Sequence, residues 1–156
     1  MSDTYSAPGF AVAFAARDDV VRATLADLRA RLTHLGMSPG TCGTVEIVMA
    51  EVLNNIVEHA YADSKPGAVD MAVAIGDDRL SINLRDSGIP LPDHVLHDTG
   101  LPDTTAALED LPEGGFGWHL IRELTSALGY VRKGGQNHLH MQFDIAGPMD
   151  RARHDN

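Results

Sequence analysis

Two pairs of short alternating segments most constrain the fold of this chain, because a tight turn joins the members of each pair. Apolar residues alternate with small or polar ones over 69–75 and again over 80–84, with a Gly-Asp-Asp turn between them. A second pair, 130–132 and 139–145, is separated by a turn predicted at 134–137. Alternation with a period of two indicates strands with one buried face, and tight turns pair such strands antiparallel. The sequence therefore excludes a doubly wound parallel sheet.

The N-terminal part of the chain predicts a strand followed by a helix. Residues 10–16 alternate between large apolar and small side chains, which suits a strand. A helix is then expected to begin with Asp18 or Asp19 as its cap and to end at Gly36, where a cap glycine belongs. Its apolar residues recur at spacings of three and four and make one buried face: Val21, Leu25, Leu28, Leu32 and Leu35.

Two further helices complete the pattern. One begins at Ser38-Pro39, with the serine as cap and the proline in the first position, and continues to about Tyr61. The other covers 118–128 and ends at Gly129. Three helices and hairpin-paired strands predict an α+β fold. We expect a two-layer α/β sandwich, with the helices on one face of a mixed, largely antiparallel sheet.

Length, composition and charge indicate a single globular domain and exclude some partners. The chain has 156 residues, 44% of them hydrophobic, so one domain is expected over 8–146, with tails at 1–7 and 147–156. The N-terminus lacks a secretory pattern, no apolar run is long enough to span a bilayer, and there is a single cysteine. A cytoplasmic location is therefore expected. The net charge of -10 argues against nucleic-acid and anionic-membrane partners, which require clustered Lys and Arg.

The second predicted helix carries a polar ridge along an otherwise apolar body. Glu51, Asn55 and His59 are four residues apart, so their side chains lie one above another. Asparagine is a poor helix former because its side chain competes for backbone hydrogen bonds. A carboxylate, an amide oxygen and an imidazole in line suit a metal ion with a base beside it. A solvated flank is the alternative, and this stretch alone supports both interpretations.

The returning strand of the first hairpin ends in Asp86-Ser87-Gly88. A carboxylate at this place can accept a hydrogen bond from a ligand amino group, and a glycine beside it lets a flat ligand approach the backbone closely. Asp-x-Gly is also a good turn sequence, so the alternative is a plain turn.

Glycines gather just before the last predicted helix, at Gly114, Gly115 and Gly117. Backbone N–H groups exposed at the positive end of a helix dipole bind phosphate without a basic side chain, which suits an acidic chain. The spacing matches neither the P-loop nor the dinucleotide-binding pattern.

The segment 89–113 loses all periodicity and contains four prolines. A long irregular segment in a small domain is more typical of a functional lid than of a linker, with a plain surface loop as the alternative. There is no Lys or Arg between Arg85 and Arg122. If a phosphate ligand binds here, a magnesium ion held by the Asn55 oxygen and by the phosphates themselves would have to neutralise its charge.

Four short motifs follow one another along the chain: Glu51-x-x-x-Asn55-x-x-x-His59, Asp86-x-Gly88-x-Pro90, Gly114-Gly115-x-Gly117-x-x-Leu120 and Gly135-x-Asn137-x-Leu139-x-Met141. Their order and spacing resemble the N, G1 and G2 boxes of the GHKL ATPases, and specifically the bacterial anti-sigma-factor serine/threonine kinases. The resemblance covers residues 8–146. Pro90 stands where the wider superfamily has a glycine.

The resemblance implies a Bergerat-type ATP-binding fold with residues 89–113 as the ATP lid. By similarity, Asn55 would coordinate Mg²⁺, Glu51 would activate the hydroxyl of a substrate serine, and Asp86 would bind the adenine amino group. The ATP-binding positions that it implies are Asn55, His59, Asp86, Gly88, Pro90, Gly114, Gly115, Phe116, Gly117 and Leu120.

The function implied by the resemblance is that of a protein kinase and a switch. Such a protein would bind Mg-ATP, sequester a sigma factor or similar regulator, phosphorylate a serine or threonine of a small antagonist protein, and form a homodimer. A non-catalytic nucleotide-binding module for partner switching is the alternative, because the lid lacks basic side chains; an α/β scaffold with vestigial boxes is a third. Histidine kinases share the boxes but add a dimerisation helix, for which 156 residues leave no room.

Overall fold

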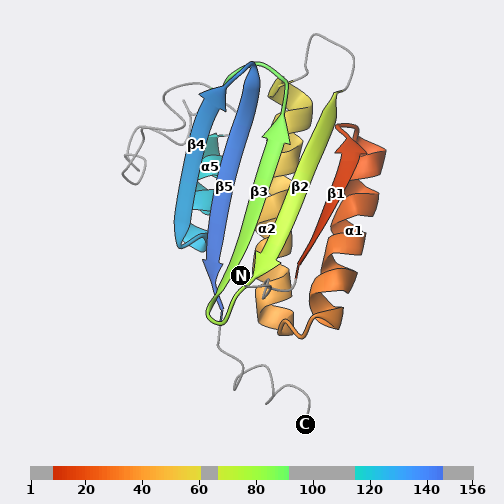
Figure 1. Cartoon of the computed structure of the whole chain (residues 1–156), viewed down its shortest axis with the longest axis vertical. Helices are drawn as coiled ribbons and strands as arrows, with labels where there is room; N and C mark the ends of the chain where they lie inside the picture. Colours follow the sequence, from red (N-terminus) through yellow and green to blue (C-terminus); the bar gives the residue numbers. More distant parts are fainter. Residues whose placement is uncertain (1–8, 61–66, 92–114, 146–156) are drawn as a thin grey trace, which may run out of the picture.

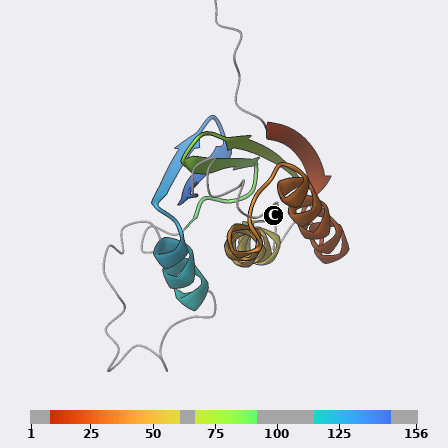
Figure 2. The same cartoon turned by 90° about the horizontal axis from the view of Figure 1, so that it is seen from below.

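A five-stranded sheet forms one layer of the molecule, and the helices lie together on one of its faces (Figures 1 and 2). The computed structural model describes residues 9–60, 67–91 and 115–145, without the side chains of residues 59, 60 and 115–117. The elements in chain order are β1 (Gly9–Ala15), α1 (Asp18–His34), α2 (Pro39–Asn55), the π-helical segment η1 (Ile56–Ala60), β2 (Ala68–Ile75), β3 (Arg79–Asp86), α5 (Gly115–Leu124), β4 (Ala127–Lys133) and β5 (Gln136–Asp144).

The strand order is β1-β2-β3-β5-β4, and each pair of neighbours is antiparallel. The predicted α+β sandwich is therefore confirmed, but the described strands form an antiparallel rather than a mixed sheet. The reason lies in the last hairpin. After α5 the chain returns as β4 at the outer edge, and β5 then inserts between β3 and β4, so no two parallel strands are neighbours.

The core lies between the sheet and the helices. Every second side chain of β2, β3 and β5 is buried against the helices, as the alternating pattern predicts. From the sheet, the core receives Val69, Met71, Val73, Ile75, Leu80, Ile82, Leu84, Leu139, Met141 and Phe143. From α1, α2 and η1 it receives Val21, Leu28, Leu32, Val45, Val48, Met49, Val52, Leu53 and Ile56. Complete burial of one such side chain stabilises the fold by about 1.5–3 kcal/mol.

The end of α1 is as predicted, whereas its start differs by one residue. Gly36 has φ 93°, its N–H donates to the Thr33 carbonyl at 3.0 Å, and the N–H of Met37 donates to the Leu32 carbonyl at 3.0 Å. These two bonds make a Schellman cap. At the start, Arg17 rather than an aspartate occupies the cap position. Asp19 lies in the first turn, where a hydrogen bond from the Arg17 guanidinium lowers the pKa of its carboxyl below the usual value.

The second helix begins as predicted but changes form before its expected end. The Ser38 hydroxyl accepts a hydrogen bond from the Thr41 N–H at 3.1 Å, and Pro39 takes the first position. An α-helix was expected to about Tyr61, but it gives way to the π-helical η1 at Ile56. The Asn55 side chain donates to the Glu51 carbonyl at 2.8 Å and so competes with the backbone for that acceptor. π-helical turns occur frequently at functional sites.

The boundaries around the last hairpin differ most from the prediction. α5 begins at Gly115 and ends at Leu124, so the expected helix over 118–128 is wrong at both ends, and Gly129 lies inside β4 instead of capping a helix. Strand pairing decides this boundary, because the Ser126 N–H already donates to the Gln142 carbonyl of β5 at 2.7 Å. The turn contains only Gly134 and Gly135, with φ 61° and 77°, so residues 136 and 137 belong to β5.

The domain limits 8–146 stay a prediction, because the tails at 1–7 and 147–156 lie outside the described residues. The same holds for the predicted lid beyond Leu91. None of the helices in the described part of the chain is long and apolar enough to cross a membrane.

Candidate functional site

Asp86 is the last residue of β3 and is only 6% exposed. Its Oδ1 accepts two hydrogen bonds, from the Gly88 N–H at 2.8 Å and from Asn137 Nδ2 at 2.9 Å. Its Oδ2 has no hydrogen-bond partner among the residues that the structure describes. A buried carboxylate oxygen without a partner is costly. This oxygen is therefore placed to accept a hydrogen bond from a ligand.

Asn137 is a second buried polar residue at this place, 3% exposed, and the sequence motifs assign it no role. Its Nδ2 donates to Asp86 Oδ1 at 2.9 Å and to the Ile89 carbonyl at 2.8 Å. Its Oδ1 accepts from the Tyr130 hydroxyl and from Arg132 Nη1, the latter at 3.1 Å. The signal in the sequence is an asparagine in alternation with the buried apolar residues of β5, but the predicted turn at 134–137 placed it outside the strand.

The two residues that donate to the Asn137 oxygen, Tyr130 and Arg132, also bond to the chain where it leaves β3. Arg132 Nη1 donates to the Gly88 carbonyl at 2.6 Å, and the N–H of Leu91 donates to the Tyr130 hydroxyl oxygen at 3.2 Å. Both side chains come from β4, which is separated from β3 in the sheet by β5. The first residues of the predicted lid are thus bonded to the last hairpin.

Of the polar ridge predicted on α2, only Asn55 is buried in the described part of the chain. Asn55 is 5% exposed, whereas Asn54 is exposed, so the two adjacent asparagines have different roles. Asn55 Nδ2 donates to the Glu51 carbonyl, which leaves Oδ1 without a hydrogen-bond partner within the described residues. Glu51 is half-buried one turn earlier. His59 lies in η1, and its side chain is outside the described set.

Two glycines of the third motif, Gly115 and Gly117, lie in the first turn of α5 and not before it. Gly115 is the first residue of this helix and Gly117 lies in its first turn, while Trp118 is buried in the core. The free N–H groups and the positive dipole end of a helix are found in that turn, so the prediction of an anion-binding backbone at this place retains its physical basis.

The remaining predicted site residues are less informative. Gly114 and residues 92–113 lie outside the described part of the chain, as does the side chain of Phe116. Pro90 is exposed and Leu120 is half-buried. Their roles stay predictions.

The informative residues are brought to one end of the molecule. The last turn of α2, the end of β3 and the start of α5 all lie at the end drawn uppermost in Figure 1. β5 pairs Asn137 with Asp86 at this end. Segments that are far apart in the sequence therefore contribute a carboxylate, an amide and a helix N-terminus to one place.

The groups at this end fit a magnesium nucleotide. Asp86 Oδ2 offers an acceptor for a base amino group, and Asn55 Oδ1 offers an oxygen for a hard cation. Within residues 9–60, 67–91 and 115–145, no cluster of three or more His, Cys, Asp or Glu side chains could hold a metal ion. Mg²⁺ does not need such a cluster, because it commonly binds through one or two protein oxygens together with substrate phosphates and water.

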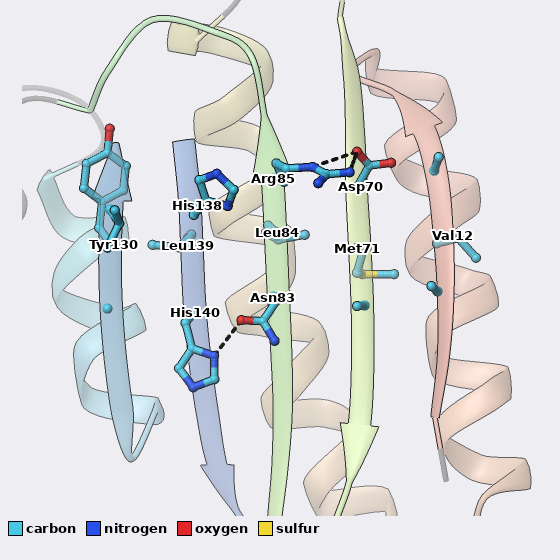
Figure 3. Close-up of a pocket in the computed structure, with 15 residues that line it drawn as sticks. Val12, Asp70, Met71, Asn83, Leu84, Arg85, Tyr130, His138, Leu139 and His140 are labelled. Atoms are coloured by element: carbon cyan, nitrogen blue, oxygen red, sulfur yellow. Dashed lines mark hydrogen bonds and ion pairs between the residues drawn. The ribbon is translucent and has the colours of Figure 1, made fainter. Parts of the chain in front are cut away.

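A hollow of about 790 Å³ lies elsewhere, over the open face of the sheet (Figure 3). Arg85 and Asp70 form an ion pair across it at 2.9 Å, and His140 Nδ1 lies 2.7 Å from Asn83 Oδ1. None of the predicted site residues lines this hollow. It is on the side of the sheet away from the helices, so it is not the site to which the motifs point (Figure 3).

Comparison with known proteins also points to a nucleotide-binding domain. The family described as "Histidine kinase-like ATPase domain" matches residues 14–143. The serine/threonine-protein kinase BtrW of Bordetella bronchiseptica is 33% identical over 97 residues, which cover 62% of this chain and 66% of that protein. The serine-protein kinase RsbW of Oceanobacillus iheyensis is 30% identical over 106 residues, which cover 67% of this chain and 65% of that protein. The matched region thus spans slightly less than two thirds of each relative.

Solved structures share the fold. The crystal structure of the RsbU and RsbW domains from Mycobacterium tuberculosis superposes with a TM-score of 0.61 at 20% identity, covering 90% of this chain and 33% of that one. The crystal structure of the SiaB-SiaC complex from Pseudomonas aeruginosa superposes with a TM-score of 0.53 at 16% identity, covering 86% and 89%. At these identities the likeness concerns the fold alone.

Proposed function

This chain belongs to the histidine kinase-like ATPase domain family, and from that membership we propose that it is a serine/threonine protein kinase of the anti-sigma-factor type that uses Mg-ATP. The observation that carries the proposal is the pair of buried oxygens at one end of the molecule. Asp86 Oδ2 and Asn55 Oδ1 have no partners among the described residues, and the start of α5 lies at the same end.

Each of these groups has a distinct task in nucleotide binding. The Asp86 carboxylate would accept a hydrogen bond from the adenine amino group, and Gly88 would lie beside the ring. The Asn55 oxygen would hold the magnesium ion, and the N-terminal turn of α5, with Gly115 and Gly117, would hold the phosphates. His59, Pro90, Gly114, Phe116 and Leu120 complete the proposed ATP-binding set. When bound, Mg-ATP supplies the phosphoryl group.

Glu51 is the proposed general base. Its backbone carbonyl holds the Asn55 side chain at 2.8 Å, which ties the base to the proposed metal ligand across one helical turn. The residue is only half-buried, which supports access for a hydroxyl group of a second protein. Glu51 would accept the proton of that serine or threonine as its oxygen bonds to the γ-phosphorus and ADP leaves.

The partners are proposed from the relatives. BtrW and the RsbW proteins are named protein kinases, which supports a serine or threonine of another protein as the phosphoryl acceptor. The resemblance to the anti-sigma-factor kinases suggests a small antagonist protein as that substrate. By the same analogy, the chain would bind a sigma factor or a similar regulator and form a homodimer in the cytoplasm. The SiaB-SiaC complex gives a precedent for a protein partner bound to this fold.

The test is to separate phosphoryl transfer from ATP binding with Glu51→Gln, which keeps the size of the side chain but removes its basicity. The measurement is transfer of labelled γ-phosphate to proteins that co-purify with the wild type, alongside calorimetric ATP binding. We expect transfer to fall by about 10²–10⁴-fold, with ATP binding retained. Glu46→Gln, on the same helix and paired with Arg29, is the control and should transfer at the wild-type rate. Normal transfer by Glu51→Gln would refute the role of Glu51.

A second function remains a candidate because the chain has no Lys or Arg between residues 85 and 122. Phosphoryl transfer benefits from positive charge near the γ-phosphate. A module that binds nucleotide as a structural ligand and exchanges protein partners does not need positive charge there. Wild-type protein that binds Mg-ATP but labels no co-purified protein would favour this second function.

A further inference from the structure

We infer that Asn137 is a positioning residue that sets the selectivity for the nucleotide base, by holding the Asp86 carboxylate in one orientation with the help of Tyr130 and Arg132. The inference rests on the proposed ATP binding. It concerns a residue on β5, more than fifty positions away from Asp86 in the sequence but directly paired with it in the sheet.

The Asn137 amide is held in one orientation. Its oxygen faces two donors, the Tyr130 hydroxyl and Arg132 Nη1, while its nitrogen faces two acceptors, Asp86 Oδ1 and the Ile89 carbonyl. Turning the amide over would oppose donor to donor on one side and acceptor to acceptor on the other. Because the side chain is buried, water cannot readily replace these partners.

A fixed amide in turn fixes the carboxylate. Asn137 and the Gly88 N–H both donate to Oδ1 of Asp86, so the carboxylate is held by one oxygen and presents the other, Oδ2, in a set direction. An acceptor in a set direction favours a base with an amino group and disfavours a base with a carbonyl group at the same place. Without Asn137, only the Gly88 N–H would hold Oδ1, so the carboxylate would rotate more readily about its χ2 bond and bind water, and the preference for a base with an amino group would weaken.

The same cluster joins base recognition to the start of the predicted lid. Asn137 holds the Ile89 carbonyl, Arg132 holds the Gly88 carbonyl at 2.6 Å, and Tyr130 accepts from the Leu91 N–H. The position of Asp86 and the path of residues 88–91 are therefore set by one group of side chains. A substitution in this group of side chains is therefore expected to change the selectivity for the base more than the packing of the hydrophobic core.

The decisive experiment compares two ligands, ATP and purine riboside triphosphate, which lacks the 6-amino group. For the wild type we expect ATP to bind about 10- to 100-fold more tightly, the effect of one hydrogen bond to a buried charged group. In Asn137→Ala we expect this ratio to fall below about threefold. A purely structural role would weaken both ligands equally and leave the ratio unchanged, which would overturn the inference.

Two further variants keep the test decisive. Tyr130→Phe removes one hydroxyl and keeps the ring, so it should fold and lower the ratio by a smaller factor, about two- to fivefold, through the loss of one partner of Asn137. Asn83→Ala, on the open face of the sheet, is the matched control and should keep the wild-type ratio. If Asn137→Ala does not fold, a wild-type ratio in Tyr130→Phe overturns the inference, and so does a lowered ratio in Asn83→Ala. Failure of the wild type to bind ATP at all would instead refute the proposed function.

Discussion

Two neighbouring asparagines on α2 illustrate how environment decides the role of a residue. Asn54 is exposed, while Asn55 is buried and bonded through its nitrogen to the Glu51 carbonyl. The four-residue spacing from Glu51 was sufficient to predict that Asn55 belongs to the ridge. That the Asn55 oxygen has no hydrogen-bond partner among the described residues was not predictable, because it depends on which way the amide turns.

This pair provides a matched test of the proposed magnesium ligand. Asn55→Ala should lose at least about tenfold of the magnesium-dependent gain in ATP affinity, since a charge-assisted contact of about 1.5–3 kcal/mol is removed. Asn54→Ala should keep the full gain, because its side chain faces away from the buried ridge. Titration calorimetry with and without Mg²⁺ measures both. An unchanged magnesium dependence in Asn55→Ala would contradict the assignment.

At the scale of elements, helix ends were predicted better where a local signal exists. The cap at Gly36 is encoded by a glycine at the end of a regular apolar pattern, and Ser38-Pro39 marks the next start. The end of α5 was predicted wrongly, at Leu128 instead of Leu124. Leu128 suits a helix face and a strand face equally, and only its pairing with Met141 across the hairpin decides between them.

Two glycines of the helical layer should respond oppositely to the same substitution. Gly36→Ala places a side chain at φ 93°, which should destabilise the fold by about 1–2 kcal/mol. Gly43→Ala lies inside α2, where an added Cβ meets nothing within 4 Å, and should stabilise it by about 0.5–1 kcal/mol. Thermal unfolding should show shifts of about 2–4 °C per kcal/mol, of opposite sign. A loss of stability in both variants would contradict this account.

For the whole molecule, the fold class was predictable because hairpins and amphipathic helices are local features. The strand order was not, since the central pairing of β3 with β5 joins residues such as Leu84 and Leu139 that are far apart in the sequence. The candidate site was predictable as a set of motifs, but its support by Tyr130, Arg132 and Asn137 depends on that same long-range pairing.

Ligand binding should be visible in the stability of the whole domain. Mg-ATP at a hundred times its dissociation constant should add about 2.7 kcal/mol to the free energy of unfolding. For a chain of this size, that corresponds to a rise in Tm of about 5–11 °C in calorimetry. GTP at the same concentration should give a much smaller rise, because its base has a carbonyl where Asp86 needs a donor. An equal rise with GTP would contradict the role of Asp86.

The two-residue turn at Gly134 and Gly135 restricts the insertions and deletions that this chain can accept during evolution. Side chains of a strand alternate between faces, so a hairpin lengthened or shortened by one residue would turn Tyr130 and Arg132 to the opposite side of the sheet from Asn137. Selection is therefore expected to reject an insertion or a deletion at this turn, and the positive φ angles of Gly134 and Gly135 favour glycine at both of its positions. The length of the loop and its two glycines together are the inherited traits that keep the proposed nucleotide site assembled.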